Sequence, residues 1–439
     1  MKHGVSEHPY YVSSIVHTFM RLLKKLDHLL TTLRRLDPDH HNDIISHGMG
    51  TRTLNVESLI VPDIDPTSRD IVIADRLLKA YRRSIENEIS HKDVQQADLW
   101  SSIKMMQPTF LEVLHGGDPD SLAAYLCNMS RHDATIGTVQ GNIEHQRIQH
   151  KPSYRNFVAL MIKDKLVSLA EAVGAISCEN PEQGRWGENL HMSVDFLVEQ
   201  VERVVGMDIS PPPIDGGLLK IRSSRGLFHE RDLNAIYTAW ILKDILPAVS
   251  SAAVCEIGAG SGRVAYWSWR YGFRSYTIYD LPHINVVQGF YLLKSLPDIP
   301  ISLFGEQNAE NTTQGMAIQP YYMIHSERSG KFDLILNQDS FPEINANTVR
   351  AYLERIKLLS RQFFLSINHE SRPPSIGNEL QLNVQDIIDS VGDYRRLLRA
   401  PYWLRRGYVA ELYAICGKES GENIRPGSRP SRPVGESVI

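Results

Sequence analysis

The chain has 439 residues, of which 42% are hydrophobic, with a formal net charge of -4 and a sequence pI near 6.5. This length provides for a buried core and for two or three domains. The slightly acidic balance argues against a protein that coats nucleic acid or binds a membrane through a polybasic surface, and it favours small or neutral substrates.

The spacing of the cysteines and the hydropathy of the chain indicate the cellular compartment of the protein. Cys127, Cys178, Cys255 and Cys416 lie far apart without a C-x-x-C pair, so neither a disulfide framework nor a structural zinc site is predicted. The N-terminal residues lack a signal-peptide pattern, and no run of about 18 apolar residues could span a bilayer. We therefore expect a cytoplasmic protein that binds neither nucleic acid nor membrane.

The N-terminal residues predict an amphipathic helix. Residues 12–36 carry apolar side chains at spacings of three and four among basic ones, and Asp37-Pro38 ends the segment. This helix could pack on the chain's own core or join subunits of a homo-oligomer. Seven of the 17 histidines lie in the first 50 residues, but without the H-x-x-x-H spacing of a metal site, so we predict solvated loop histidines.

Helical periodicity continues through the first half of the chain, where strand-like alternation is scarce. Helices are predicted at residues 71–89, 99–114, 118–129, 154–173 and 189–205. The loop at residues 179–187 combines proline, glycines, Arg185 and Trp186. It could be a lid over a cofactor domain or a structural loop with a packed tryptophan.

A domain boundary is predicted at residues 210–217, where three prolines are followed by two glycines. The expected organisation is a mainly helical N-terminal region at residues 1–215, a second domain at residues 216–417, and a tail at residues 418–439. The tail is rich in Gly, Pro, Ser and Arg and has little apolar surface to bury, so it is expected to be disordered.

Strands and helices alternate after this boundary. Strands are predicted at residues 254–257, 275–279, 301–304, 332–336 and 363–367, helices at 231–246, 263–271, 284–296, 349–359 and 384–390, and a closing antiparallel pair at 395–400 and 408–416. Such alternation predicts a parallel, doubly wound, Rossmann-like α/β sheet. Residues 306–331 are predicted to form a long polar loop.

The first of these strands runs directly into three glycines, Gly258, Gly260 and Gly262, and a predicted helix follows. Glycines at a strand-to-helix turn allow the backbone to approach a ligand, and the helix start offers unpaired N–H groups. The arrangement predicts a loop that binds a small-molecule cofactor.

The glycine spacing selects among cofactors. A dinucleotide fingerprint, G-x-G-x-x-G, would need a glycine where Arg263 stands, so a dehydrogenase is disfavoured, and no Gly-Lys-Ser/Thr follows to make a phosphate loop. The remaining pattern, E-x-G-x-G-x-G from Glu256, resembles the first motif of the class I S-adenosylmethionine-dependent methyltransferases.

Two carboxylates accompany this motif. Asp280 ends the second predicted strand, where it could accept hydrogen bonds from both vicinal hydroxyls of a ribose, or else cap the helix that follows Leu281. Glu256 lies in a strand that should be buried, and a buried charge needs partners. The polar residues 337–343 end the fourth strand, at the edge where a methyl donor and its acceptor would meet.

In order along the chain, residues 256–263, 276–282, 332–343 and 363–368 resemble the sugar O-methyltransferase family. The resemblance covers about residues 220–417 and extends through the Asn180-Pro-Glu-Gln-Gly loop to about residue 160. It implies a class I methyltransferase sheet, S-adenosylmethionine as cofactor, and methyl transfer to a hydroxyl of a sugar or glycan. The cofactor-binding residues that it implies are Glu256, Gly258, Gly260, Gly262, Asp280, Leu281 and Asn337.

Methyl transfer to a hydroxyl requires a group that takes up the hydroxyl proton. His369 follows the fifth strand at the same sheet edge, where Glu370 could orient it, and a histidine changes charge near neutrality. Asp339 is the second candidate base, and His369 could instead be a hydrogen-bonded loop residue. Asp339 and Glu343 alone are weak evidence for a cation site, so no metal is predicted.

Two other functions are compatible with these residues. The chain could methylate a small molecule other than a sugar, because the loops that select the acceptor cannot be placed from the sequence. It could also be a cofactor-binding scaffold whose helical half recruits partners.

Overall fold

The computed structural model describes residues 54, 56–88, 99–139, 142–180, 182, 187–306, 314–371 and 381–416. The predicted amphipathic helix at residues 12–36, the histidine-rich N-terminal segment and the tail at residues 418–439 lie outside the described residues. Arg185 and Trp186 of the candidate lid also lie outside them.

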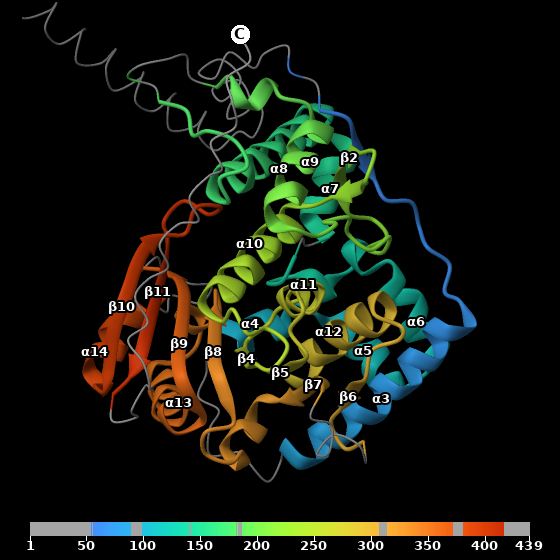
Figure 1. Cartoon of the computed structure of the whole chain (residues 1–439). Coiled ribbons are helices and arrows are strands. Elements are labelled where there is room, and N and C mark those ends of the chain that lie inside the picture. Colours follow the sequence, from blue (N-terminus) through green and yellow to red (C-terminus); the bar gives the residue numbers. More distant parts are fainter. Residues whose placement is uncertain are drawn as a thin grey trace, which may run out of the picture.

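A sheet of eight strands forms the centre of the protein, in the order β10-β11-β9-β8-β4-β5-β7-β6 (Figure 1). The strands are β4 (Ala253–Ile257), β5 (Ser275–Asp280), β6 (Ile301–Leu303), β7 (Gly315–Pro320), β8 (Phe332–Gln338), β9 (Ser360–His369), β10 (Tyr394–Pro401) and β11 (Tyr408–Ile415). All neighbouring pairs are parallel except those made by β11, which runs antiparallel to both β9 and β10. The predicted Rossmann-like α/β sheet and its antiparallel closing pair are confirmed.

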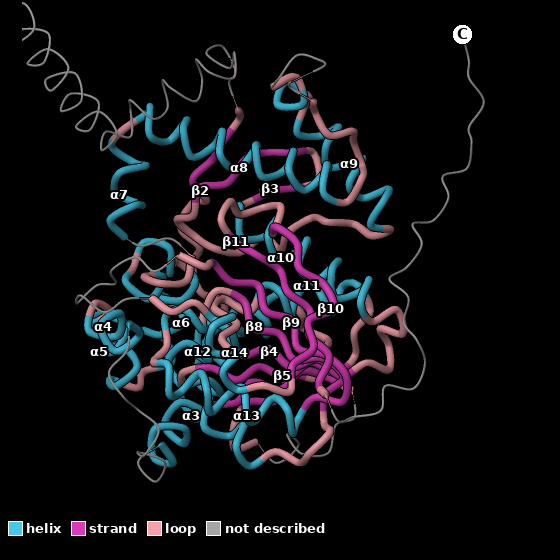
Figure 2. The backbone as a smooth tube through the Cα atoms, turned by 90° about the vertical axis from the view of Figure 1, so that its left-hand side faces the viewer, coloured by secondary structure: helices cyan, strands magenta, loops and turns pink. Residues whose placement is uncertain are grey.

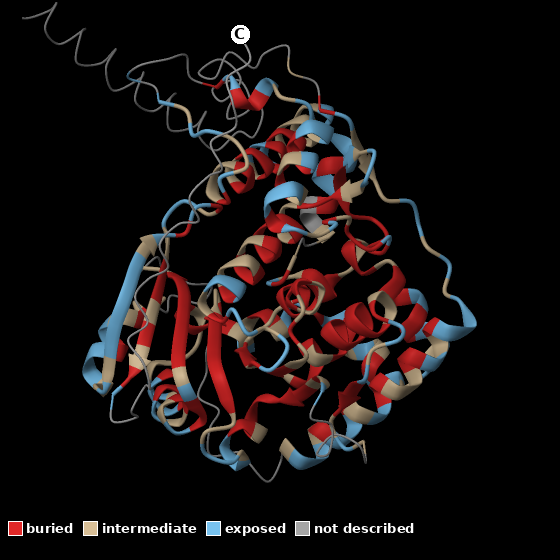
Figure 3. Cartoon of the chain, viewed as in Figure 1, coloured by how far each residue is buried: buried red, intermediate tan, exposed pale blue. Residues whose placement is uncertain are grey.

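Helices cover both faces of this sheet (Figure 2). They are α10 (Glu230–Ile245), α11 (Arg263–Tyr271), α12 (Pro282–Ser295), α13 (Ala346–Leu359) and α14 (Val384–Val391). Successive residues of a strand point to opposite faces, so Val254 and Leu334 join the core with α10, α11 and α12, whereas Cys255 and Ile335 join the core with α13 and α14. Figure 3 shows the central strands buried and the edge strand β10 exposed.

The N-terminal region is mainly helical, as predicted. Its helices are α3 (Ser68–Glu88), α4 (Leu99–Met105), α5 (Pro108–Gly116), α6 (Pro119–Cys127), α7 (Asn142–His150), α8 (Pro152–Ala172) and α9 (Val194–Val205). The single helix predicted at residues 99–114 is divided, because Pro108 occupies the first turn of a new helix. A small antiparallel sheet of β1 (Ser58–Ile60), β2 (Leu219–Ser223) and β3 (Gly226–Phe228) was not predicted.

The long loop predicted at residues 306–331 is wrong in its second half. Strand β7 and a 3₁₀ helix, Tyr321–Ser326, occupy it, and β7 lies between β5 and β6. The strand predicted at residues 301–304 therefore becomes the sheet edge β6. The buried Met316 and Ile318 of β7 are two residues apart, a short alternation that the polar residues before it obscure.

The N-terminal helices pack directly on the sheet domain. Leu77 of α3 lies so close to α12 that a Cβ atom at Gly289 would come 2.4 Å from its Cδ2 atom. Leu77, Leu122 and Val286 belong to one hydrophobic cluster, which continues across the boundary predicted at residues 210–217. The division of the chain at residue 215 stays a prediction.

None of the helices in the described ranges is both long and apolar enough to cross a lipid bilayer. The cytoplasmic location and the homo-oligomer stay predictions.

Candidate functional site

The loop between β4 and α11 depends on glycine. Gly258, Gly260 and Gly262 have φ angles of 74°, 55° and 77°, in the left-handed region that side chains disfavour. A Cβ atom at Gly258 would lie 2.2 Å from the Oγ atom of Ser340, so the loop presses against the end of β8. The loop backbone therefore lies exposed to a ligand on one side and is supported by β8 on the other.

Asp280 lies at the end of β5, beside this glycine loop. Its carboxylate accepts hydrogen bonds from the backbone N–H of Leu281, at 2.8 Å, and from Nε2 of Gln288, at 2.5 Å. Burial raises the pKa of Asp280 to about 6, although these bonds and the backbone N–H groups of Ala259 and Gly260 oppose the rise. Asp280 is thus held against the loop and is ionised near neutral pH.

Glu256 is buried in β4, and its Oε2 atom accepts a hydrogen bond of 2.8 Å from the hydroxyl of Tyr276. Burial raises the pKa of Glu256 to about 8, and the nearby Asp280 carboxylate adds to the rise. Glu256 is therefore largely protonated at pH 7, and a cationic group beside it would favour its ionised form.

A cavity with about 1330 Å³ of free space, open to solvent, lies at the carboxyl ends of β4, β5 and β8. Of the predicted site residues, its lining contains Glu256, Gly258, Gly260, Asp280, Leu281 and Asp339. Ligands of doubly wound sheets bind at this edge. Trp100, Gly137 and Thr138 of the N-terminal region also line the cavity, a contribution that the sequence did not predict.

Asn337 and Gly262 do not line this cavity. The fully buried Asn337 donates from Nδ2 to the carbonyl oxygen of Ile257, at 3.0 Å, and to Oγ of Ser340, at 2.6 Å. It accepts from Nδ2 of Asn368, at 3.0 Å. Asn337 thus joins the ends of β4, β8 and β9 and holds Ser340 against the glycine loop.

A second, outer cavity continues from the first. The two share Gly137, Thr138, Arg231, Asp339, Glu343 and Arg405, and the outer one adds, among others, His369, Arg406 and Tyr408. His369 lines only the outer cavity, whereas Asp339 lines both. The two predicted catalytic residues therefore lie at different depths of one continuous space.

Asp339 directly follows β8 in a left-handed conformation, with φ of 65°. Its carboxylate accepts from Arg405 and from the hydroxyl of Tyr408, and its backbone N–H donates to Oδ1 of Asn368, at 2.9 Å. A non-glycine residue with positive φ is uncommon and costs free energy unless its surroundings enforce it. Here the hydrogen bonds hold the carboxylate between the two cavities.

His369 ends β9, and its ring meets that of Tyr408 edge-on, with centroids 5.5 Å apart. The Nδ1 atom lies 3.1 Å from the carbonyl oxygen of Ser371. The hydroxyl oxygen of Ser371 lies 3.3 Å from the same Nδ1 atom, and in the neutral tautomer in which Nδ1 donates to the carbonyl oxygen, Nε2 keeps a lone pair. Glu370, expected as the orienting group, instead binds Arg399 through both oxygens, each at 2.8 Å.

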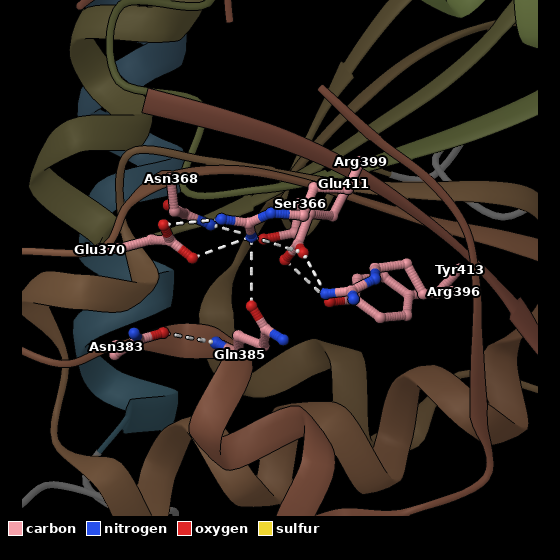
Figure 4. A network of polar contacts seen from close by, with 9 residues as sticks. All are labelled: Ser366, Asn368, Glu370, Asn383, Gln385, Arg396, Arg399, Glu411 and Tyr413. Atoms are coloured by element: carbon pink, nitrogen blue, oxygen red, sulfur yellow. Dashed lines mark hydrogen bonds and ion pairs between the residues drawn. The ribbon is translucent and has the colours of Figure 1, made fainter. Parts of the chain in front are cut away.

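A polar network links β10 and β11 to the chain just after β9, the strand that ends at His369 (Figure 4). The buried carboxylate of Glu411 accepts from Arg396 and Arg399, both at 2.9 Å, and from the hydroxyl of Tyr413, at 2.8 Å. These contacts link β10 and β11 to Glu370, next in the chain after β9. The chain directly after β9 is therefore held to β10 and β11 by ion pairs.

Glu343 lines both cavities and is a site residue that the sequence suggested only as a metal ligand. Burial raises its pKa to about 8, with the charge of Asp339 adding to the rise and a hydrogen bond from Trp100 opposing it. Glu343 is therefore largely neutral at pH 7 and can donate a hydrogen bond. Within the described ranges, no three His, Cys, Asp or Glu side chains are grouped to hold a metal ion.

Arg263 is buried behind the glycine loop. It pairs with Asp215, at 2.8 Å, and with Asp232, and its guanidinium lies 4.7 Å from the centre of the Tyr291 ring. Lys220 also pairs with Asp215, at 3.0 Å. In the sequence, Arg263 was informative only because it stands where a dinucleotide fingerprint would need a glycine. A charge directly after the last glycine, on a helix that must be buried, was the available signal for this cluster.

No protein-family model matches the chain, and no curated protein matches it. Among solved structures, magnesium protoporphyrin IX methyltransferase from Synechocystis with bound S-adenosylmethionine is 12% identical, with 43% of this chain and 82% of that chain covered and a TM-score of 0.31. The 1,6-didemethyltoxoflavin-N1-methyltransferase of Burkholderia thailandensis is 19% identical, covering 42% of this chain and 78% of that chain, with a TM-score of 0.30. Both TM-scores are below 0.5, so the fold assignment rests on the strand order of this chain.

Proposed function

We propose that this chain is an S-adenosylmethionine-dependent methyltransferase that methylates a hydroxyl of a sugar or glycan. The observation that carries the proposal is the meeting of the glycine loop, Glu256 and Asp280 in one cavity at the carboxyl edge of the sheet. The sugar acceptor is supported only by the resemblance in the sequence.

In this proposal the cofactor lies along the ends of β4 and β5. Asp280 accepts hydrogen bonds from the two ribose hydroxyls, and the backbone at Gly258 and Gly260 approaches the cofactor closely. Glu256 faces the methionine part, whose ammonium group favours the ionised carboxylate. Asn337 and Gly262 shape the loop without touching the cofactor.

The donor sulfonium is already activated, so the chain's own residues align the acceptor oxygen and take up its proton. We propose His369 as the base, acting through Nε2 in the neutral tautomer in which Nδ1 donates to the carbonyl oxygen of Ser371. The carboxylate of Asp339 is occupied by Arg405 and Tyr408, which suits a group that positions the acceptor. Asp339 remains the alternative base.

Calorimetry with S-adenosylmethionine tests the cofactor assignment. The wild-type chain should bind it, and Asp280→Ala should bind about 10–100-fold more weakly, because hydrogen bonds to a charged group contribute about 1.5–3 kcal/mol. Asp298→Ala, which removes an exposed carboxylate after α12, is the matched control and should bind normally. Equal affinity of Asp280→Ala would refute the ribose contact, and a wild-type chain without affinity would refute the methyltransferase itself.

Turnover with methyl-labelled cofactor and a panel of nucleotide sugars and glycans tests the base. His369→Ala should lower kcat by about 10²–10⁴-fold without weakening the cofactor affinity. His150→Ala, on the exposed last turn of α7, is the control. Undiminished turnover of His369→Ala, together with loss of turnover in Asp339→Asn, would transfer the role of base to Asp339.

A further inference from the structure

The outer cavity carries more positive than negative charge. Arg231, Arg405 and Arg406 line it, together with the carboxyl groups of Asp339 and Glu343. The carboxylate of Asp339 is bound by Arg405, and Glu343 is largely neutral because burial raises its pKa to about 8. Two guanidinium groups, those of Arg231 and Arg406, are left without a carboxylate in the cavity.

Arg231 lines both cavities. Its Nε atom is buried and makes no hydrogen bond within the described part of the chain. The Glu230 carboxylate lies 3.6 Å from this atom, which is longer than a hydrogen bond, and Glu230 also lies 3.9 Å from Nζ of Lys165. Arg231 therefore brings its positive charge to both cavities, while the carboxylate paired with it, that of Glu230, lines neither.

Asn234 supplies the complementary unused group. It lies three residues after Arg231 on α10, so both side chains leave the same face of the helix. Asn234 lines the inner cavity, and its side-chain Oδ1 atom is buried and has no donor among the described residues. One helix turn thus brings an amide whose Oδ1 atom has no donor to the inner cavity and a guanidinium to both cavities.

We propose that the outer cavity binds an oxyanion of the acceptor, a phosphate or a carboxylate, through Arg231 and Arg406, while Asn234 accepts a hydrogen bond from a hydroxyl of the same molecule. Guanidinium groups bind both oxyanions in the same planar geometry. The acceptor is then a hydroxylated anion with its charge outermost and its hydroxyl towards the methyl donor. The proposal rests on the proposed function only in calling this molecule the acceptor.

Two features separate this subsite from the rest of the site. The guanidinium of Arg405 donates to the carboxylate of Asp339, and its Cζ atom lies 3.8 Å from the centre of the Tyr408 ring. Arg405 is therefore held in the wall of the cavity. Arg406, the next residue, is exposed and has no ion pair with any described carboxylate. The neutral Glu343 adds a hydrogen-bond donor and no repulsion towards an anion.

The test uses the full chain without cofactor, so that it does not depend on methyl transfer. Inorganic phosphate is titrated and followed by ³¹P line broadening, and labelled acetate by ¹³C line broadening. At least one anion should bind the wild-type chain. The double variant Arg231→Gln/Arg406→Gln should bind that anion at least tenfold more weakly, while binding S-adenosylmethionine as the wild type does.

The matched control is Arg222→Gln/Arg225→Gln, which removes the same charge from exposed arginines paired with Glu57 and Glu202. It should bind the anions normally, which excludes an effect of net charge. Phosphate binding alone assigns a phosphorylated acceptor, and acetate binding assigns a carboxylated one. The proposal is overturned if neither anion binds the wild type, or if the arginine double variant binds as tightly as the control.

Discussion

Gly258→Ala is expected to lower the affinity for S-adenosylmethionine by more than about 100-fold. The new Cβ atom would lie 2.2 Å from Oγ and 2.5 Å from Cβ of Ser340, and the residue would keep a φ of 74° that costs about 1–2 kcal/mol for alanine. Ser340 cannot easily move away, because Oγ is hydrogen-bonded by Asn337. The glycine loop must therefore shift, and calorimetry measures the result.

Gly260→Ala is the control for this variant. Gly260 also has a positive φ, of 55°, but no atom lies within 4 Å of the position of its Cβ. The Gly260→Ala variant has the backbone strain but not the clash, so its affinity for S-adenosylmethionine should fall much less than that of Gly258→Ala. Equal losses in both variants would mean that backbone strain alone, and not support from β8, determines the loop conformation.

Arg263→Met is expected to lower the free energy of unfolding by about 3–5 kcal/mol, the cost of leaving buried carboxylates without their partner. Asp215 and Asp232 are buried and both accept hydrogen bonds from Arg263, so the variant leaves two carboxylates short of positive charge. Lys220 remains to pair with Asp215, whereas Asp232 loses its only charged partner in the described structure. Urea unfolding of the full chain measures the change.

Arg270→Met, on the same helix, is the matched control. Arg270 is partly exposed and lies 3.7 Å from Asp208, so its loss should cost about 0–1 kcal/mol. If Arg263→Met and Arg270→Met lowered the free energy of unfolding by the same small amount, the buried ionic cluster would not be what holds α11 against α10 and the segment before β2. The double variant Arg263→Met/Asp232→Leu should recover part of the stability, since it removes one orphaned charge.

Some residues that line the inner cavity could be predicted from the sequence as site residues, and others could not. Gly258 and Asp280 were predictable because each lies at the end of a strand with a recognisable local pattern, and parallel strands bring such ends to one edge. Trp100, Arg231 and Arg405 line the same space but lie in segments with no common pattern. Their meeting depends on how the N-terminal helices and the β10–β11 connection pack, which no local periodicity encodes.

Strand β7 shows the same limit at the level of the fold. The buried residues of β4 and β8 form apolar runs that local patterns reveal, whereas Gly315–Pro320 has only a short alternation after a polar segment. Its place between β5 and β6 is decided by pairing with β5 over six residues, a long-range contact. The predicted polar loop therefore contains a strand of the central sheet.

The sequence by itself determined the alternation of strands and helices, the glycine loop after β4, and the carboxylates that accompany it, because these follow from local periodicity and from backbone conformations that only glycine adopts easily. Only the tertiary structure decided that Asn337 supports the loop from behind, that Arg263 closes a buried ionic cluster, and that Arg231 and Asn234 line the cavities. Burial and unpaired hydrogen-bonding groups are properties of the packed chain, and they arise only when distant segments meet.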